Sequence, residues 1–153
     1  MRPFKSQICI SRPIWFDTHM AVFMGIDYGA KRIGVAFTDE AETMAFPHSV
    51  VENNADVFYA LKKLAEEKQA KKIVVGLPLA LDGEPTDATA GAREFAKRLG
   101  RETGLAVDFA DERFTSAQAR RAGNPDMAVD ASSAALILEQ YISRDDFMKR
   151  KMG

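Results

Sequence analysis

The sequence is poor in the residues that build disulfides and zinc sites. Its 153 residues include a single cysteine, Cys9, and two histidines, His19 and His48. One cysteine cannot form a disulfide within the chain, and neither histidine lies in a metal-binding motif. We therefore expect both histidines to be ordinary surface or partly buried residues. A reducing, cytoplasmic setting fits this composition best.

The chain also lacks a strong net charge and a long apolar run. Its net charge is −1 at pH 7, which excludes a protein that coats nucleic acid by bulk positive charge. An anionic partner must then be held by a local basic patch or by a bound metal ion. No apolar run approaches the roughly 20 residues that span a bilayer, so no membrane partner is expected. The 46% of hydrophobic and 28% of charged residues are typical of a globular domain.

The first part of the chain differs in pattern from the rest. Residues 1–20 show no sustained periodicity and lack the apolar core of a signal peptide. We expect a flexible N-terminal extension there, one domain over residues 21–144, and a charged C-terminal tail over residues 145–153. One hypothesis places the natural start at Met20 or Met24. Mass spectrometry of the native protein tests it, and a native start at the first residue would refute it.

Strand-like and helix-like patterns alternate along the domain. Strands are predicted at residues 22–28, 32–38, 43–51, 72–77 and 105–110. Helices are predicted from Asn53 or Asn54 to about residue 67, and at residues 86–103, 115–123 and 129–143. The short linker between the first two strands predicts a hairpin, and Pro47 favours an edge position or an irregularity for the third strand. The whole order predicts an α/β fold, a mixed five-stranded sheet with helices on both faces. Sites in such sheets lie at the carboxyl ends of the parallel strands.

Three carboxylates stand near those strand ends or at a helix start. Asp27 lies near the end of the first strand, on the strand face of Phe23 and Gly25. Glu112 follows the fifth strand, and Asp130 begins the last helix on its inward face. An inward carboxylate is costly unless its desolvation is compensated, and Mg²⁺ prefers oxygen ligands. Two such ions about 4 Å apart can clamp the oxygens of a phosphodiester during hydrolysis.

Each carboxylate also has an ordinary explanation. Asp27 is also typical of a turn residue that precedes a glycine. Glu112 can pair with Arg113, and Asp130 can simply favour the helix dipole. Asp111 is adjacent to Glu112 and can take its place in a site. Spacing alone does not show that these groups converge.

Residues beside the carboxylates are candidates for binding phosphate. They are Gly29, Lys31, Arg32, Gly76, Pro78 and Arg113. A glycine lets a phosphate approach the backbone closely, and a lysine or arginine supplies charge-assisted hydrogen bonds. A strand stop at Gly76-Leu77-Pro78 and solvation of surface cations are the plain alternatives.

Four segments together resemble a known family. They read GIDYGAKRIGVAFTD, IVVGLPLALDG followed by REFAKRL, DERFTSAQA, and VDASSAALILEQYI. They resemble the YqgF/RuvX family, whose members are similar to Holliday-junction resolvases and are linked to maturation of the 5′ end of pre-16S ribosomal RNA. The resemblance covers about residues 23–144.

The resemblance implies an RNase H-like fold and a metal-dependent endonuclease with a two-metal site for Mg²⁺ or Mn²⁺. The family's acidic positions fall on Asp27, Glu112 and Asp130, with Asp27 bridging the metals. It implies a nucleic-acid partner, either pre-rRNA in a ribosome precursor or branched DNA, and a monomer or homodimer. Family members often carry a basic loop before the last helix, whereas residues 123–130 here contain no lysine or arginine. This difference predicts weaker backbone binding from that side.

Three other functions compete with rRNA processing. Resolution of four-way DNA would favour a symmetric dimer that makes paired cuts. An Asp-x-Gly on a hairpin, as at residues 27–29, also resembles the phosphate loop of the actin, hexokinase and Hsp70 group, which binds ATP. A non-catalytic nucleic-acid-binding or ribosome-assembly module is the third.

Overall fold

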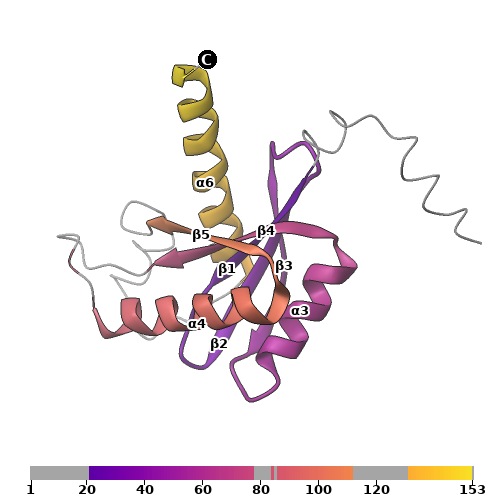
Figure 1. Cartoon of the computed structure of the whole chain (residues 1–153), viewed down its shortest axis with the longest axis vertical. Coiled ribbons are helices and arrows are strands. Elements are labelled where there is room, and N and C mark those ends of the chain that lie inside the picture. The colour runs from indigo at the N-terminus through magenta and orange to yellow at the C-terminus, as the bar shows by residue number, and fades with distance from the viewer. Residues whose placement is uncertain (1–20, 78–83, 85, 112–130, 153) are drawn as a thin grey trace, which may run out of the picture.

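The structure is a computed structural model that describes residues 21–77, 84, 86–111 and 131–152. Figure 1 shows the arrangement of its elements. In chain order they are β1 (Val22–Asp27), β2 (Arg32–Thr38), β3 (Ala45–Glu52), α3 (Val57–Glu67), β4 (Ala70–Leu77), α4 (Asp87–Thr103), β5 (Ala106–Asp111) and α6 (Ala131–Met152).

The strands form one mixed sheet in the order β3-β2-β1-β4-β5. β1 pairs antiparallel with β2, and β2 with β3, so the predicted hairpin is confirmed. β1, β4 and β5 run parallel to one another. β3 is an edge strand, as Pro47 predicted, and its pairing with β2 shifts register between Val35 and Ala36. The predicted five-stranded mixed sheet is therefore confirmed.

Helices cover the two faces of the sheet (Figure 1). On one face, Met24 and Ile26 of β1 pack in a core with residues of α3 and α4, among them Leu61 and Leu99. On the other face, Phe23 belongs to a core that includes the inward residues of α6. Because side chains alternate along a strand, β1 supplies both cores. The centre of the sheet is therefore buried on both sides.

Helix boundaries agree with the sequence at α4 and differ at α3. Thr86 caps α4 in a reciprocal capping box with Thr89, and Gly104 ends the helix at a φ of 73°. The predicted N-cap of the preceding helix is wrong, because α3 begins after Asp56. Asn54 instead accepts a hydrogen bond from the Asp56 backbone N–H at 3.0 Å. Asn53 binds elsewhere, as described below.

The last helix is longer than the sequence pattern predicted. It was expected to end near Ser143, but α6 continues to Met152. No proline or glycine interrupts residues 131–152, and Arg150 and Lys151 favour the negative end of the helix dipole. The helix predicted at residues 115–123 lies outside the described residues. In the part of the chain that the structure describes, no helix is both long and apolar enough to cross a membrane.

Candidate active site

Asp27 closes β1 at the centre of the sheet, with 0% of its surface exposed. It is in register with Gly34 on β2 and with Gly76 on β4. Because both neighbours are glycines, no side chain flanks the Asp27 carboxylate along its row of the sheet. Asp27 is thus a strand residue within both ladders rather than the turn residue of the plain alternative.

β1 lies against α6 along one face of the sheet. The ring of Phe23 makes an edge contact with Tyr141, with centroids 6.1 Å apart. A Cβ added at Gly25 would lie 2.4 Å from Cγ of Leu138 and 3.0 Å from the carbonyl oxygen of Ala134. Moving two residues along β1, from Phe23 to Gly25, therefore moves the contact on α6 by about one helical turn toward the start of that helix. Strand alternation puts Asp27 next on this face, as predicted.

The carboxyl ends of β1, β4 and β5 lie side by side. Gly76 is in register with Asp27 on one side and with Ala110 of β5 on the other. Two strand spacings separate Asp27 from Ala110, about 10 Å between Cα atoms. Ala110 is buried in the core beneath α6. The row of paired residues that begins at Asp27 therefore continues through Gly76 of β4 to Ala110 of the edge strand β5.

The turn between β1 and β2 is held by Asn53. Its side-chain Nδ2 donates to the Gly29 carbonyl at 3.0 Å, and its backbone N–H donates to the Lys31 carbonyl at 2.9 Å. Lys31 and Arg32 are exposed, and neither forms an ion pair with another described residue. The turn thus presents two available cations from a fixed backbone beside the end of β1.

The structure places part of the predicted site. Asp27, Gly29, Lys31, Arg32 and Gly76 lie at or next to the carboxyl ends of the central strands. Glu112, Asp130, Pro78 and Arg113 lie outside the described residues. Among the described residues, no group of three or more His, Cys, Asp or Glu side chains could hold a metal ion. The predicted metal site thus stays a prediction.

Two residues of this region were not predicted for the site. Gly34 interrupts an apolar strand pattern, which is a known signal of a close approach of another group to the backbone. Asn53 was assigned to a helix cap, and only the tertiary structure brings it to the turn. The sequence shows Gly34 within a strand and Asn53 before a helix, but it does not show that Gly34 pairs with Asp27 or that Asn53 binds Gly29.

The sequence model of the RuvX family, described as Holliday junction resolvase, matches residues 21–144. The chain belongs to the RuvX family. A relative from Bordetella parapertussis, named "Putative pre-16S rRNA nuclease", is 39% identical over 121 residues, covering 78% of this chain and 91% of the relative. A relative of the same name from Nitratidesulfovibrio vulgaris is 41% identical over 131 residues, covering 79% and 92%. The predicted family resemblance is confirmed.

Solved structures show which fold this RuvX-family chain has. RuvC of T. thermophilus in complex with a Holliday junction substrate aligns with a TM-score of 0.53 at 14% sequence identity. The alignment covers 82% of this chain and 96% of RuvC. At this identity the likeness establishes the fold alone. The predicted RNase H-like fold is confirmed.

Proposed function

We propose that this RuvX-family chain is a metal-dependent endonuclease that processes the 5′ end of pre-16S rRNA in a ribosome precursor in the cytoplasm. The observation that carries the proposal is the fully buried Asp27, in register with Gly34 and Gly76 at the carboxyl ends of the central strands. The names of the relatives, which align over most of their length, support the choice of substrate.

Strand alternation favours Glu112 over Asp111 as the second carboxylate. Asp108 accepts a hydrogen bond from Tyr141 of α6, and Ala110 packs in the core beneath α6. These two β5 residues therefore face the same side of the sheet as Asp27. If the alternation continued past Ala110, Asp111 would face the opposite side and Glu112 would face the side of Asp27, which supports Glu112 as the proposed ligand.

The contacts between β1 and α6 favour Asp130 as the third carboxylate. Along this face Phe23 meets Tyr141, and Gly25 meets Leu138 and Ala134. The next residue on the face is Asp27, so the same progression brings it opposite the start of α6. Asp130 directly precedes the first residue of that helix.

The donor chemistry of these residues fits a divalent ion. A buried carboxylate is stabilised when it coordinates a metal, and Mg²⁺ and Mn²⁺ take carboxylate oxygens. We propose that Asp27, Glu112 and Asp130 hold one or two such ions. Bound there, the metal supplies an activated water and stabilises the leaving oxygen.

The other site residues would position the scissile phosphate. Lys31 and Arg32 would approach it from the fixed β1–β2 turn, and Arg113 is proposed as a third cation because it follows Glu112 in the sequence. Gly29 and Gly76 carry no side chain that would obstruct the strand, and Pro78, which follows β4 in the sequence, is proposed as a further contact. Charge-assisted hydrogen bonds of this kind orient a phosphate without reading sequence.

A nuclease assay on a pre-rRNA 5′ leader with Mn²⁺ or Mg²⁺ tests the proposal. We expect cleavage by the wild type and loss of cleavage in Asp27→Asn and Asp130→Asn. Asp56→Asn is the matched control, because Asp56 is exposed and its side chain makes no capping hydrogen bond. Cleavage that survives both substitutions would refute the assignment of Asp27 and Asp130 to the active site. RNA binding without any cleavage would favour a non-catalytic module.

Four-way DNA is the second candidate substrate. It is favoured by the description of the matching family model and by the RuvC structure with its junction. The same variants assayed on a four-way junction discriminate the two substrates. Paired symmetric cuts by a homodimer would support resolution, whereas a monomer that cuts only RNA would support rRNA processing.

A further inference from the structure

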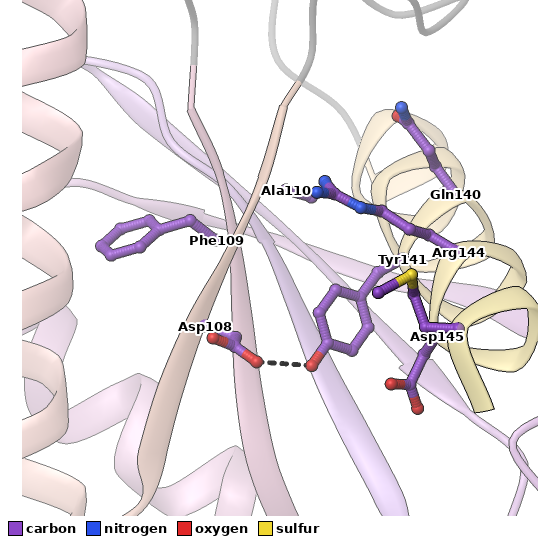
Figure 2. A pocket seen from close by; sticks show the side chains of 8 residues that line it. Asp108, Phe109, Ala110, Gln140, Tyr141, Arg144 and Asp145 are labelled. Atoms are coloured by element: carbon purple, nitrogen blue, oxygen red, sulfur yellow. Dashed lines mark hydrogen bonds between the residues drawn. The ribbon is translucent and has the colours of Figure 1, made fainter. Parts of the chain in front are cut away.

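A hollow lies beside the candidate active site, between β5 and α6 (Figure 2). Its volume is about 270 Å³, and Ala110, Asp108, Tyr141, Arg144 and Asp145 are among the residues that line it. Ala110 is the residue that ends the row from Asp27 through Gly76. A strand bound at Asp27 would therefore reach the hollow within a short stretch of its length.

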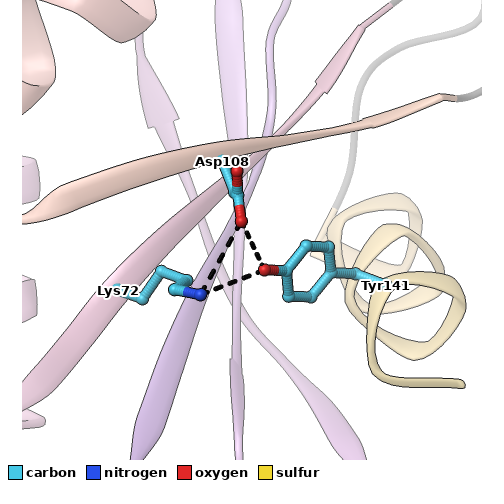
Figure 3. A network of polar contacts seen from close by, with 3 residues as sticks. All are labelled: Lys72, Asp108 and Tyr141. Atoms are coloured by element: carbon cyan, nitrogen blue, oxygen red, sulfur yellow. Dashed lines mark hydrogen bonds and ion pairs between the residues drawn. The ribbon is translucent and has the colours of Figure 1, made fainter. Parts of the chain in front are cut away.

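One wall of the hollow is fixed by a polar network (Figure 3). The Tyr141 hydroxyl donates to Oδ2 of Asp108 at 2.5 Å and accepts from Nζ of Lys72 at 3.1 Å. Lys72 also lies 3.7 Å from Oδ2 of Asp108 and 5.3 Å from the ring centroid of Phe23. The Tyr141 ring and the Asp108 carboxylate are therefore held in place before any ligand arrives.

Arg144 crosses the hollow from the opposite side. Figure 2 shows its guanidinium extended from α6 toward Ala110. Its side chain is exposed and forms no ion pair with another described residue. The guanidinium therefore offers planar donors that no other described residue pairs with in an ion pair.

The charges favour a base rather than a phosphate as the ligand. Asp108 and Asp145 counter the positive charge of Arg144 and Lys72, so the hollow is not an anion site. A base edge instead presents both acceptors for an arginine and amino donors for a carboxylate. Unpaired RNA bases stack on aromatic rings and guanidinium planes, and both are present here. The volume lies just below the ~300–1,000 Å³ of pockets for drug-sized ligands, which suits one planar group.

We propose that this hollow binds one unpaired base of the RNA strand that is cut at Asp27. Arg144 and Asp108 contact the edge of the base, and the Tyr141 ring contacts its plane. The inference rests on the proposed function, because it takes RNA as the substrate. It adds that the strand must be unpaired next to the cleavage site, since a base held in a duplex cannot enter the hollow.

An abasic scan tests the subsite. A short fluorescein-labelled single-stranded RNA is titrated with the chain in EDTA, and each base is replaced in turn by an abasic sugar that keeps its phosphate. We expect the wild type to lose about tenfold in affinity at one position, the size of one good base contact. Arg144→Met should bind the intact RNA about tenfold more weakly than the wild type does. Its affinity should not fall further when the base at that position is removed.

Two further variants separate base reading from charge. Arg150→Met is the matched control, since Arg150 is exposed on the same helix and does not line the hollow. It should bind like the wild type. Arg144→Lys keeps the charge without the planar fork, so it should not restore the position-specific loss. Full rescue by lysine would show a phosphate contact and overturn the proposal.

Cleavage in Mn²⁺, measured in parallel, separates this proposal from the proposed function. Cleavage by the wild type together with a flat abasic scan overturns the base subsite and leaves the nuclease. A position-specific loss without cleavage supports the subsite and overturns the nuclease. Binding only to four-way DNA, with no response to abasic RNA, overturns both the subsite and the RNA substrate.

Discussion

Asp27 and Gly76 are in register on the parallel strands β1 and β4, so the residue beside the buried carboxylate has no side chain. The same holds on the other side, where Gly34 of β2 opposes Asp27. Neither flanking glycine carries a side chain that would block a group approaching Asp27 along this row of the sheet. This supports the proposal that a metal ion or a phosphate binds there.

Substitution of Gly76 by alanine should impair cleavage more than folding. The added methyl group would stand beside the Asp27 carboxylate, on the face that β1 shares with α6. A displacement of about 1 Å in a catalytic group can cost about 100-fold in rate, so we expect a loss of that order in Gly76→Ala. The measurement is kcat/KM on the pre-rRNA leader, with the urea midpoint taken on the same preparation.

Gly100→Ala provides the matched control for Gly76→Ala. Gly100 lies within α4, and an added Cβ would come 3.2 Å from the tip of the Val107 side chain. Alanine is favoured over glycine inside a helix by up to about 1 kcal/mol, which offsets the crowding against Val107, so stability should change little. Equal activity loss in both variants would show that room beside Asp27 does not matter.

Substitution of Gly25 by alanine should destabilise the fold itself. The new Cβ would overlap Leu138, at 2.4 Å from its Cγ, and would press on the Ala134 carbonyl at 3.0 Å. Overpacking of a core commonly costs about 1–3 kcal/mol, and α6 would be pushed away from β1. Urea unfolding of Gly25→Ala should show a lower midpoint with the slope retained.

A double mutant identifies the contact responsible for that loss. Leu138→Ala alone should cost about 2–5 kcal/mol, because it leaves a cavity beneath α6. In Leu138→Ala the added methyl at Gly25 gains space, so the double variant should be more stable than the sum of the two losses predicts. Strict additivity would show that the Ala134 carbonyl, rather than the Leu138 side chain, limits the fit.

The sequence was sufficient where local chemistry decides the structure. The β1–β2 hairpin and the edge position of β3 follow from a short linker and a proline. The boundaries of α4 follow from apolar residues at helical spacing and from Gly104 at its end. The family was recognised from four segments within about residues 23–144, and the family model matches residues 21–144.

The sequence was insufficient where a residue far away in the chain determines the role of a side chain. Asn53 was expected to cap a helix, but its amide meets the Gly29 carbonyl 24 positions away in the chain. Gly34 gains its meaning only from its register with Asp27. Arg144 followed the expected end of the last helix, and only the continuation of α6 brings it to the hollow beside β5.

Acid should weaken the connection between β2 and β3. The Asp39 carboxylate accepts hydrogen bonds from the Thr43 N–H at 2.7 Å, the Thr43 hydroxyl at 2.5 Å and the Met44 N–H at 3.2 Å. Burial acts to raise the pKa of Asp39, but these hydrogen bonds outweigh it and lower the pKa below the ordinary value of 3.8. The stabilisation is therefore complete above pH 3.8 and is lost as pH falls through the lowered pKa.

The variant Thr43→Val checks this dependence. It removes the hydroxyl donor, so the pKa of Asp39 should move up toward its ordinary value and less stability should be lost in acid. Urea midpoints measured across the acid range give the comparison. Thr103→Val is the control, because that hydroxyl donates to the Leu99 carbonyl and to no carboxylate. An identical pH profile in the wild type and Thr43→Val would contradict the assignment.

The β1–β2 turn should depend on Asn53 for its position. Asn53→Ala removes the hydrogen bond to the Gly29 carbonyl and should cost about 0.5–1.5 kcal/mol in the free energy of unfolding. The turn carries Lys31 and Arg32, so its loosening should also raise KM for the RNA leader more than it lowers kcat. Steady-state kinetics well below the unfolding temperature measures the two parameters separately.

Asn54→Ala is the neighbouring control for this role. The Asn54 side chain accepts from the Asp56 N–H at 3.0 Å, and no hydrogen bond joins it to the described residues of the β1–β2 turn. Loss of that bond should lower stability by a similar amount, because it shapes the approach to α3, while KM stays at the wild-type value. A common rise of KM in both variants would trace the effect to general destabilisation. A rise confined to Asn53→Ala would show that the turn must be held in place for its cations to reach the substrate.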